Sequence, residues 1–221
     1  MKTHILTTAL AAFLFGAPAV LPGPAVAQDA VSVAPGLRLS AADRADLQRV
    51  ENYFNAMTTV QSSFIQASSS GYIAQGMLWI KRPGRVRFEY APPSPILITA
   101  DGIWLTYQDN ELEQTSRVPL ATSAIGVIVD DTVVFDDDLT VEAVIRENNV
   151  LRVTVSRDTL LEQGKVTLTF QDKPFALKQW VVQDAQGIEV KVALLDPVFG
   201  IDIPAKTFVP NSYDRGADKG R

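Results

Sequence analysis

Apolar and polar residues follow two different periods along the chain. From Ala41 onward, apolar residues recur at steps of three and four, with charged residues between them. These apolar positions are Leu47, Val50, Phe54, Met57 and Val60. The period predicts an amphipathic helix of about five turns. Ser40 followed by Asp43 has the sequence of a capping box, which predicts that the helix begins directly after Ser40.

After Thr59 the period changes to two, and turn residues such as Pro83-Gly84, Asn148-Asn149 and Gln186-Gly187 separate the runs. The alternating runs are Leu78/Ile80/Arg82, Val86/Phe88/Tyr90, Leu139/Val141/Ala143/Ile145, Leu151/Val153/Val155, Val166/Leu168/Phe170 and Ile188/Val190/Val192/Leu194. Short strands joined by such turns predict an antiparallel meander. Because only one face of each strand is apolar, we expect one sheet that curls around a common interior. The fold class is therefore mainly β with helices (α+β), in a single domain over 41–208.

One segment departs from the strand pattern. Residues 117–129 are mostly small and apolar, and four of them have helical spacing: Leu120, Ala124, Ile125 and Ile128. We expect a short apolar helix, interrupted at Gly126, that covers the open end of the sheet together with the first helix. The alternation does not distinguish an interior filled as a packed core from one that encloses an apolar cavity.

The composition excludes several classes of chemistry. The 221 residues include no cysteine and one histidine, His4. Disulfides, thiol nucleophiles and thiolate metal sites are thus excluded, as is a lipid anchor on an N-terminal cysteine. If processing removes His4, catalytic triads and histidine-bound zinc are excluded too. The formal net charge of −5 argues against nucleic acid as a partner, because phosphates require a basic surface.

The N-terminus has the features of a secretory signal. A basic Lys2, an apolar stretch over 5–20 and the small-residue site Ala25-Val26-Ala27 predict a signal peptide over 1–27 that is cleaved near Ala27. Pro18, Pro22 and Pro24 break the apolar run before it reaches the roughly 20 residues of a membrane span. We expect an exported, soluble product with a flexible leader at 28–40 and a polar tail at 209–221.

Two groups of acidic residues are candidate sites. Asp130, Asp131, Asp136, Asp137 and Asp138 do not have the spacing of a calcium loop, and such clusters are normally solvated turns. Asp101 and Asp109 flank a hairpin, where aspartate commonly serves the backbone of a turn. No pair of carboxylates suggests acid–base chemistry, so we expect no enzyme and no metal or other cofactor.

An ordered set of motifs points to a family. The set comprises Phe64-Ile65-Gln66, the stretch Gly76-Met77-Leu78-Trp79-Ile80-Lys81-Arg82-Pro83-Gly84, Val86 to Tyr90, Pro93, Ile96-Leu97-Ile98 and Asp101-Gly102. This order, from about residue 47 to 107, resembles the periplasmic outer-membrane lipoprotein carrier family LolA. The resemblance implies an incomplete β-barrel with a helical lid over a hydrophobic cavity. It also implies a monomeric carrier that takes acylated lipoproteins from an inner-membrane lipoprotein-releasing ABC transporter complex and hands them to an outer-membrane acceptor.

The resemblance assigns roles to particular residues. Arg82 matches the family arginine that holds the lid closed by hydrogen bonds. Arg82 also has the strand parity of Leu78 and Ile80, so a buried guanidinium there needs hydrogen-bond acceptors such as carbonyls at a helix end. The residues expected to line the lipid-binding cavity are Leu78, Ile80, Val86, Phe88, Tyr90, Ile96, Ile98, Val50, Phe54, Met57, Leu120 and Ile125. Without the resemblance, an arginine before proline at a strand end is more often an exposed edge residue, and the apolar set is more often plain core.

Other functions remain open from the sequence. The same fold could carry another lipid or amphiphile, or sense mislocalised lipoproteins. An exported hydrolase or lyase that uses carboxylates alone needs two acids at a defined separation in a cleft, and no candidate pair appears. A purely structural envelope protein is a further alternative.

Overall fold

The computed structural model describes residues 31–135, 138–157 and 164–212. The chain divides into two units, 1–30 and 31–221, and all that follows concerns the second. The helical elements are α1 (Ala41–Ala56), η1 (Leu120–Thr122), α2 (Ala124–Val129) and η2 (Ala205–Phe208), where η denotes a 3-10 turn. The strands are β1 (Thr59–Ser68), β2 (Ile73–Lys81), β3 (Arg85–Tyr90), β4 (Ile96–Asp101), β5 (Trp104–Asp109), β6 (Gln114–Pro119), β7 (Thr140–Glu147), β8 (Val150–Ser156), β9 (Lys165–Gln171), β10 (Ala176–Gln183) and β11 (Glu189–Phe199). The predicted signal peptide over 1–27 lies outside the described residues.

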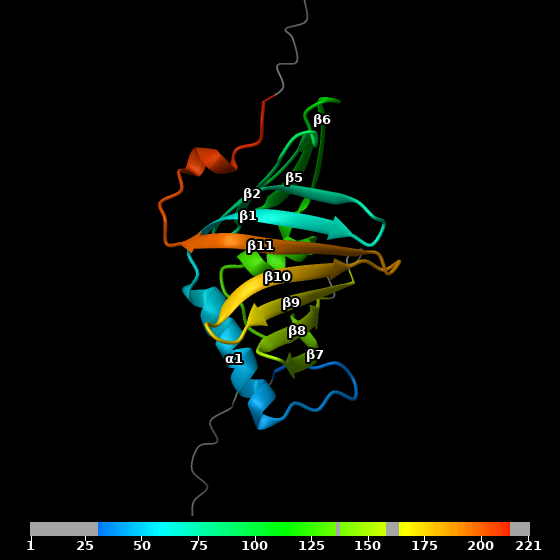
Figure 1. Cartoon of the computed structure of the whole chain (residues 1–221), viewed down its shortest axis with the longest axis vertical. Coiled ribbons are helices and arrows are strands. Elements are labelled where there is room, and N and C mark those ends of the chain that lie inside the picture. The colour runs from blue at the N-terminus through cyan, green and yellow to red at the C-terminus, as the bar shows by residue number, and fades with distance from the viewer. Residues whose placement is uncertain (1–30, 136–137, 158–163, 213–221) are drawn as a thin grey trace, which may run out of the picture. The chain divides into compact units, whose positions relative to one another are not determined.

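The strands form one antiparallel sheet of 11 strands in the order β6-β5-β4-β3-β2-β1-β11-β10-β9-β8-β7. The chain runs from the centre to one edge along β1–β6, crosses over, and returns from the other edge along β7–β11 (Figure 1). Because β6 and β7 do not pair with each other, the curled sheet stays open. This confirms the predicted fold class, an incomplete antiparallel barrel with helices.

Helix α1 begins as the sequence predicts. The Ser40 hydroxyl accepts a hydrogen bond from the Asp43 N–H, and the Asp43 carboxylate accepts one from the Ser40 N–H, which completes the capping box. The helix ends at Ala56, earlier than predicted, and Val60 lies on β1. Thr58, Thr59 and Val60 are β-branched, a residue type that favours strands over helices, so the helical period ends before Val60.

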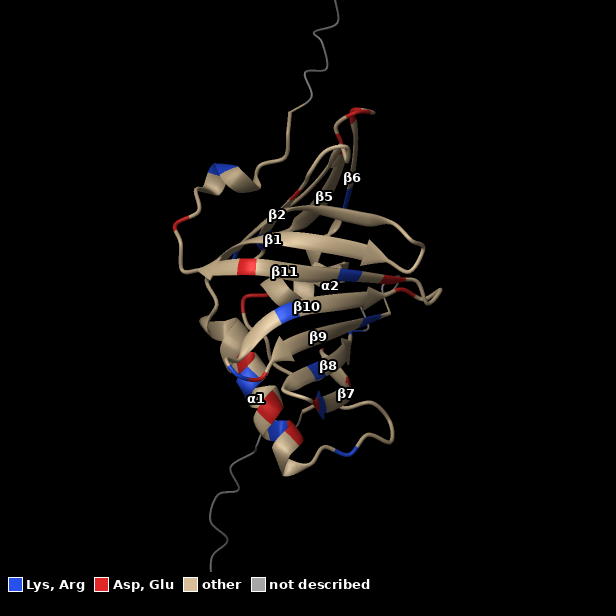
Figure 2. Ribbon diagram, viewed as in Figure 1, with Lys and Arg blue, Asp and Glu red and all other residues tan. Residues whose placement is uncertain are grey.

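A charge network attaches α1 to the β7–β10 side of the sheet. Asp46 is buried and forms ion pairs with Arg49, at 2.9 Å, and with Arg146 of β7. Arg49 also pairs with Asp172 at 2.7 Å and lies 4.2 Å from the ring centre of Phe175. Figure 2 shows acidic and basic residues following one another along α1. These contacts hold the polar side of α1 while its apolar side enters the core.

The inward positions of β8 and β9 match the predicted alternation: Leu151, Val153, Val155, Val166, Leu168 and Phe170 are all at most 1% exposed. In β7 the alternation slips at a bulge between Val141 and Ala143. Beyond the bulge, Val144 packs against the core and Ile145 is 45% exposed, so the prediction of an inward Ile145 is wrong. A bulge adds one residue to a strand and thereby inverts the facing of all later side chains.

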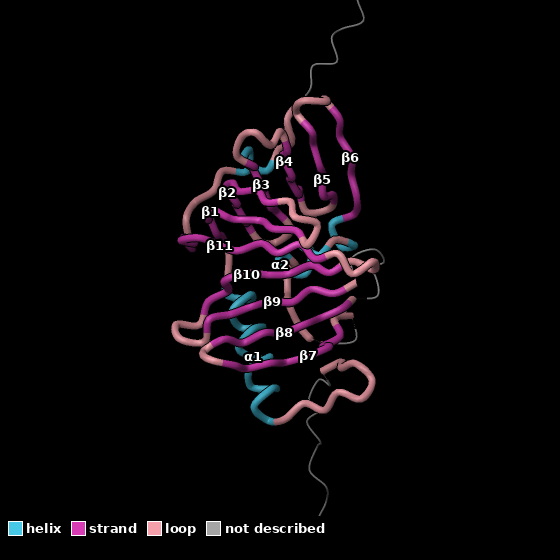
Figure 3. Tube along the Cα trace, turned by 45° about the vertical axis from the view of Figure 1, so that its right-hand side comes forward, coloured by secondary structure: helices cyan, strands magenta, loops and turns pink. Residues whose placement is uncertain are grey.

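The segment between the two edge strands differs in part from the prediction. Residues 117–119 belong to β6 and not to a helix, and η1 follows them. Helix α2 runs through Gly126 without interruption. A Cβ at residue 126 would lie 2.5 Å from the Leu120 carbonyl oxygen, so glycine permits the close approach of η1 and α2. All six residues of α2 are buried, on the side of the sheet that also holds α1 (Figures 1 and 3).

The residues before α1 lie against the edge strand β7. Val33 and Val141 form an isolated parallel bridge, with N–H···O distances of 2.9 Å from Ala34 to Val141 and from Val141 to Ser32. Val31, Leu37 and Leu39 pack partly buried against the core. This segment therefore extends the cover over the β7 edge.

Candidate functional site

The sequence-predicted cavity residues fall into three groups. Most of them are buried, at most 8% exposed, in one core cluster between the sheet and the two helices: Val50, Phe54, Met57, Leu78, Ile80, Val86, Phe88, Leu120 and Ile125. Tyr90 and Ile98 are partly buried and pack against this cluster. Tyr90 and Ile96 line an open pocket beside it. The fold thus brings the predicted residues together, mostly as packed core.

The C-terminal end of α2 is held by the turn that contains Arg82. The Arg82 guanidinium donates from Nε, at 2.9 Å, and from one Nη to the carbonyl oxygen of Asp130, the residue that follows the helix. The N–H of Gly84 donates to the carbonyl of Val129 at 2.7 Å. Burial lowers the pKa of Arg82 and the nearby Asp130 and Asp131 carboxylates oppose that shift, so the guanidinium stays charged. These bonds satisfy carbonyls that a helix end otherwise leaves unpaired.

A second arginine contacts the same helix end through the side chain of Asp130. Arg157 pairs with the Asp130 carboxylate at 2.6 Å and with Asp138 at 3.1 Å, and its own side chain is only 8% exposed. Asp130 therefore bridges two arginines, Arg82 by its carbonyl and Arg157 by its carboxylate. Arg157 could not be predicted from the sequence, since no alternating pattern or motif marks it.

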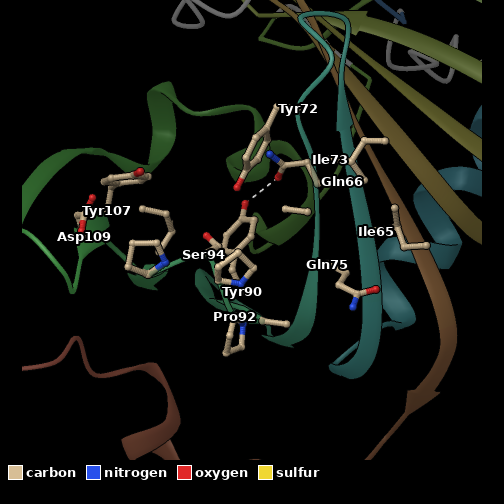
Figure 4. A pocket seen from close by; sticks show the side chains of 15 residues that line it. Ile65, Gln66, Tyr72, Ile73, Gln75, Tyr90, Pro92, Ser94, Tyr107 and Asp109 are labelled. Carbon is tan, nitrogen blue, oxygen red and sulfur yellow. Dashed lines mark hydrogen bonds between the residues drawn. The ribbon is translucent and has the colours of Figure 1, made fainter.

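An open pocket of about 780 Å³ lies beside the core, at the β1–β2 and β3–β4 turns. Its lining residues are Ile65, Gln66, Tyr72, Ile73, Ala74, Gln75, Tyr90, Ala91, Pro92, Pro93, Ser94, Pro95, Ile96, Tyr107 and Asp109 (Figure 4). Three prolines in four residues, Pro92, Pro93 and Pro95, cannot donate ladder hydrogen bonds, so the chain leaves the sheet between β3 and β4. Asn110 fixes this turn, because its N–H and side-chain amide both donate to the Pro95 carbonyl, at 3.1 and 2.6 Å.

Tyr90, which lines the pocket, contacts side chains of the core and of β1. Phe64 lies edge-on to Tyr90, with ring centres 5.2 Å apart, on either side of Gly76. A Cβ at Gly76 would lie 2.9 Å from the Phe64 ring and 2.1 Å from the Glu89 carbonyl oxygen, so only glycine permits this contact. The Tyr90 hydroxyl donates to Gln66 Oε1 at 2.7 Å (Figure 4). Burial raises the pKa values of Tyr90 and Tyr107, and Asp109 contributes to the rise at Tyr107.

Several pocket residues were not singled out from the sequence, above all Tyr72 and Tyr107. The available signals were the proline-rich turn at 92–95 and the inward parity of Tyr107, which faces Ile98 across the β4–β5 ladder. Asp101 and Asp109 have the turn role that the sequence predicts. Oδ1 of each accepts two backbone N–H groups, from Ile103 and Trp104 and from Glu111 and Leu112.

The acidic segment contains no candidate metal centre in the described part of the chain, where no three metal-binding side chains gather. Its members Asp130 and Asp138 pair with Arg157, while Asp136 and Asp137 lie outside the described residues. None of the helices within residues 31–135, 138–157 and 164–212 combines the length and apolar character that a membrane span needs.

Comparison with known proteins identifies the family. The family model described as outer membrane lipoprotein carrier protein LolA matches residues 55–211. The chain belongs to the LolA family. The match spans β1 to β11, the pocket, Arg82 and α2, so these features lie within the LolA domain.

Individual relatives of the LolA-family chain are distant. An outer-membrane lipoprotein carrier protein of Alkalilimnicola ehrlichii is 41% identical over 98 residues, which are 42% of this chain and 44% of the relative. An uncharacterized protein of Rickettsia prowazekii is 29% identical over 121 residues, 55% of this chain and 57% of the relative. The chain thus spans about half the length of these curated relatives. A solved LolA superfamily protein from Nitrosomonas europaea has a TM-score of 0.44 and 12% identity, covering 74% of this chain and 97% of that one.

Proposed function

We propose that this protein is a soluble periplasmic carrier. It binds the acyl chains of lipoproteins and moves them from an inner-membrane releasing ABC transporter complex to an outer-membrane acceptor. Family membership supports a lipid-binding carrier in general. The observation that carries the finer proposal is α2, a helix whose residues are all buried and whose C-terminal end is held by polar contacts, in a fold that also has an open pocket.

The pocket and α2 suggest how cargo would enter. A volume of about 780 Å³ falls in the range of about 300–1,000 Å³ that small-molecule pockets occupy. The end of an acyl chain would bind there first, against Tyr90 and Ile96. The rest of the chain would take the space that α2 fills, among the predicted cavity residues of the core. In this proposal α2 is the lid.

Arg82 then serves as a latch that weakens cargo binding. Each buried CH₂ of an acyl chain contributes about 0.8 kcal/mol, so an unopposed apolar cavity would retain its cargo. Displacing α2 breaks the bonds from Arg82 to the Asp130 carbonyl, and a charge-assisted hydrogen bond is worth roughly 1.5–3 kcal/mol. The loaded state loses these bonds, which lowers the net affinity and permits transfer to an acceptor. No bond of the cargo is made or broken, so the role requires no catalysis.

A release assay tests the carrier function. Spheroplasts that secrete a labelled lipoprotein are incubated with the purified protein and sedimented, alongside an acyl-free form of the same lipoprotein. We expect labelled lipoprotein in the supernatant as a soluble complex, and only when the acyl chains are present. If the label stays with the membranes although the protein extracts an apolar dye, the cavity binds another amphiphile. If neither is extracted, the interior is only a core and the proposal is wrong.

The latch is tested in the same assay by Arg82→Leu, with Arg117→Leu on the exposed edge strand β6 as the matched control. We expect Arg82→Leu to load cargo normally and to deliver it poorly to acceptor-containing membranes. Arg117→Leu should behave as the unmodified protein. Unchanged delivery by Arg82→Leu would show that the bonds to Asp130 are merely structural.

A further inference from the structure

Strand β2 is longer than its neighbour β3 at the pocket. The β2–β3 ladder ends with Gly76 opposite Tyr90. One further bond runs from the Ala91 N–H to the Gln75 carbonyl, at 2.8 Å. Strand β2 itself begins at Ile73, so its first residues pair with β1 alone. One edge of β2 is therefore open beside the pocket.

Proline explains why β3 ends there. After Ala91, the next residues in this register are Pro92 and Pro93, and Pro93 would lie opposite Ile73. Proline has no N–H to donate to a ladder, so the chain cannot continue along β2 and turns away toward β4. The open edge thus follows from the sequence of this turn.

The alternation of a strand fixes where the backbone of Ile73 points, because successive residues direct their N–H and C=O to opposite neighbours. The Tyr72 carbonyl accepts from the Ser68 N–H of β1, at 2.8 Å, and the Gln75 carbonyl accepts from Ala91 on the other side. The N–H and C=O of Ile73 and the N–H of Gln75 are therefore directed away from β1, to the side where both residues line the pocket (Figure 4). Among the described residues these three groups have no hydrogen-bond partner, and Ile73 is 72% exposed.

Donors and acceptors in this arrangement match another peptide backbone. A strand added antiparallel would exchange two hydrogen bonds with Ile73 and accept a third from the N–H of Gln75. Such strand addition takes its affinity from main-chain bonds and its specificity from the contacts of alternate side chains. Ala74, Pro92 and Ile96 in the lining offer those side chains small and apolar contacts. The site therefore suits an extended peptide with small or apolar residues.

We propose that the open edge of β2 binds the peptide segment that follows the acylated terminus of a cargo lipoprotein, as an added strand beside Ile73 and Gln75. This inference rests on the proposed function, in which acyl chains enter through the pocket, so that the residues attached to them stay at its wall. The carrier then recognises its cargo twice, by burial of the acyl chains and by bonds to the peptide backbone. It prefers acylated peptides to free lipids with the same chains, without requiring one particular sequence.

A displacement assay with three uncharged compounds of equal acyl length tests the backbone contacts. Nile red, an uncharged apolar dye, is bound to the purified protein and displaced by one of three compounds, each below its micelle concentration. These are dodecanamide, an amidated N-dodecanoyl hexapeptide of alternating alanine and serine, and the same hexapeptide with every backbone nitrogen methylated. We expect the hexapeptide to act at a concentration at least about tenfold lower than dodecanamide, since it adds several hydrogen bonds. The methylated form cannot donate to the Ile73 carbonyl and should stay within about threefold of dodecanamide.

Two substitutions at one position separate the backbone of the edge from its side chain. Ile73→Pro removes the open N–H and no bond to β1, because that N–H is directed away from β1. Ile73→Ala shortens the side chain and keeps the N–H, so it is the matched control. We expect Ile73→Pro to reduce the preference for the hexapeptide over dodecanamide at least about fivefold, and Ile73→Ala to change it less than about twofold. Thermal unfolding of both variants checks that they fold.

Amide hydrogen exchange of the unmodified protein, resolved by residue, locates the bound peptide. We expect the Ile73 and Gln75 amides to exchange at least about tenfold more slowly with the hexapeptide than with dodecanamide. The Ala74 amide, which is directed to β1, should not change. Equal displacement by the hexapeptide and dodecanamide, or unchanged exchange at Ile73 and Gln75, would overturn strand addition at this edge. Failure of the proposed function differs, because none of the three compounds would then displace the dye and the release assay would extract no lipoprotein.

Discussion

The two halves of the sheet have the same alternating pattern but differ in what their inner faces do. In the half formed by β8–β10, the inward side chains are mostly aliphatic and at most 2% exposed: Leu151, Val153, Val155, Val166, Leu168, Phe170, Leu177 and Trp180. In the half formed by β3–β5, the inner face also carries side chains that are not fully buried. These are Tyr90, Ile96, Ile98 and Tyr107, and Tyr107 is 43% exposed. We call these the closed half and the open half.

The difference arises from what covers each half. Helix α1 and residues 31–39 pack over the closed half, and α2 fills the centre. The pocket lies at the turns around Tyr72 and Pro92, and the residues that line it include none from α1, α2 or residues 31–39. Tyrosine is suited to such a place, because its ring tolerates burial while its hydroxyl needs a polar partner or water. The residue types on the inner face therefore differ between the two halves: aliphatic side chains prevail in the closed half, and tyrosines occur in the open half.

The largest effect should come from shortening an aliphatic side chain in the closed half. Leu168→Ala leaves a cavity at a fully buried position and should reduce the free energy of unfolding by about 2–5 kcal/mol. Ile96→Ala in the open half removes the same kind of side chain at the pocket and should cost only about 1 kcal/mol. Urea denaturation measures both, and Nile red binding should weaken only for Ile96→Ala.

The distinction between the closed half and the open half would be wrong if these two variants exchanged their effects. A large stability loss for Ile96→Ala would mean that the open half belongs to the packed core. Dye binding that weakens equally in both variants would mean that the dye enters the closed half.

A smaller effect should appear at the junction of the two halves. Asp130→Asn keeps the carbonyl that accepts from Arg82 and removes the carboxylate that pairs with Arg157 at 2.6 Å. Because the Asp130 side chain is 35% exposed, we expect a loss of about 1–2 kcal/mol, less than for a fully buried pair. Hydrogen exchange should accelerate at the α2 amides and remain unchanged in β9. Asp202→Asn, which removes an exposed acid away from this helix end, is the control, and an equal acceleration there would count against a specific role of Asp130.

The smallest effect concerns the stability of the fold in acid and involves the edge strand β7, next to the closed half. Hydrogen bonds from Ser156 and Lys165 hold the pKa of Glu142, on β7, below its ordinary value of 4.5. A carboxyl whose folded-state pKa is depressed adds stability above its unfolded pKa and loses it as the pH falls through the folded value. Glu142→Gln should therefore lower the free energy of unfolding by up to about 1 kcal/mol at neutral pH. The difference from the unmodified protein should vanish at pH values well below 4.5, as measured by urea denaturation across pH. A constant difference at all pH values would point to lost packing.

The parts of the fold that depend on local periodicity could be predicted from the sequence. The capping box at Ser40, the strands around Phe88 and Leu168 and the turn at Asn148-Asn149 follow from side-chain spacing and turn chemistry alone. The predictions fail where one extra residue shifts the period or where a strand has no apolar period. The bulge after Val141 turned Ile145 outward, and polar β6 has no alternation that would reveal residues 117–119 as a strand.

The site could be predicted only in part, because burial depends on contacts between distant segments. The sequence identified the inward face and Arg82, whose strand parity indicated a need for acceptors. It gave no reason to separate Ile96, at the pocket, from Ile80, in the core, since both occupy inward positions. Arg157 meets Asp130 across 27 residues, through a tertiary contact that no local pattern encodes.

The chain path gives the covering helix an unusual property. Residues 120–139 link the two edge strands β6 and β7, so α2 is attached to the sheet at both ends. If α2 and an acyl chain exclude each other, α2 is an intramolecular competitor, and its effective concentration is set by the length of this link. Dilution lowers the occupancy of the interior by any ligand from solution, but it does not lower the occupancy by α2, which belongs to the same chain. The carrier would thus hold a rival for its own cargo that returns to the vacated space without any encounter in solution.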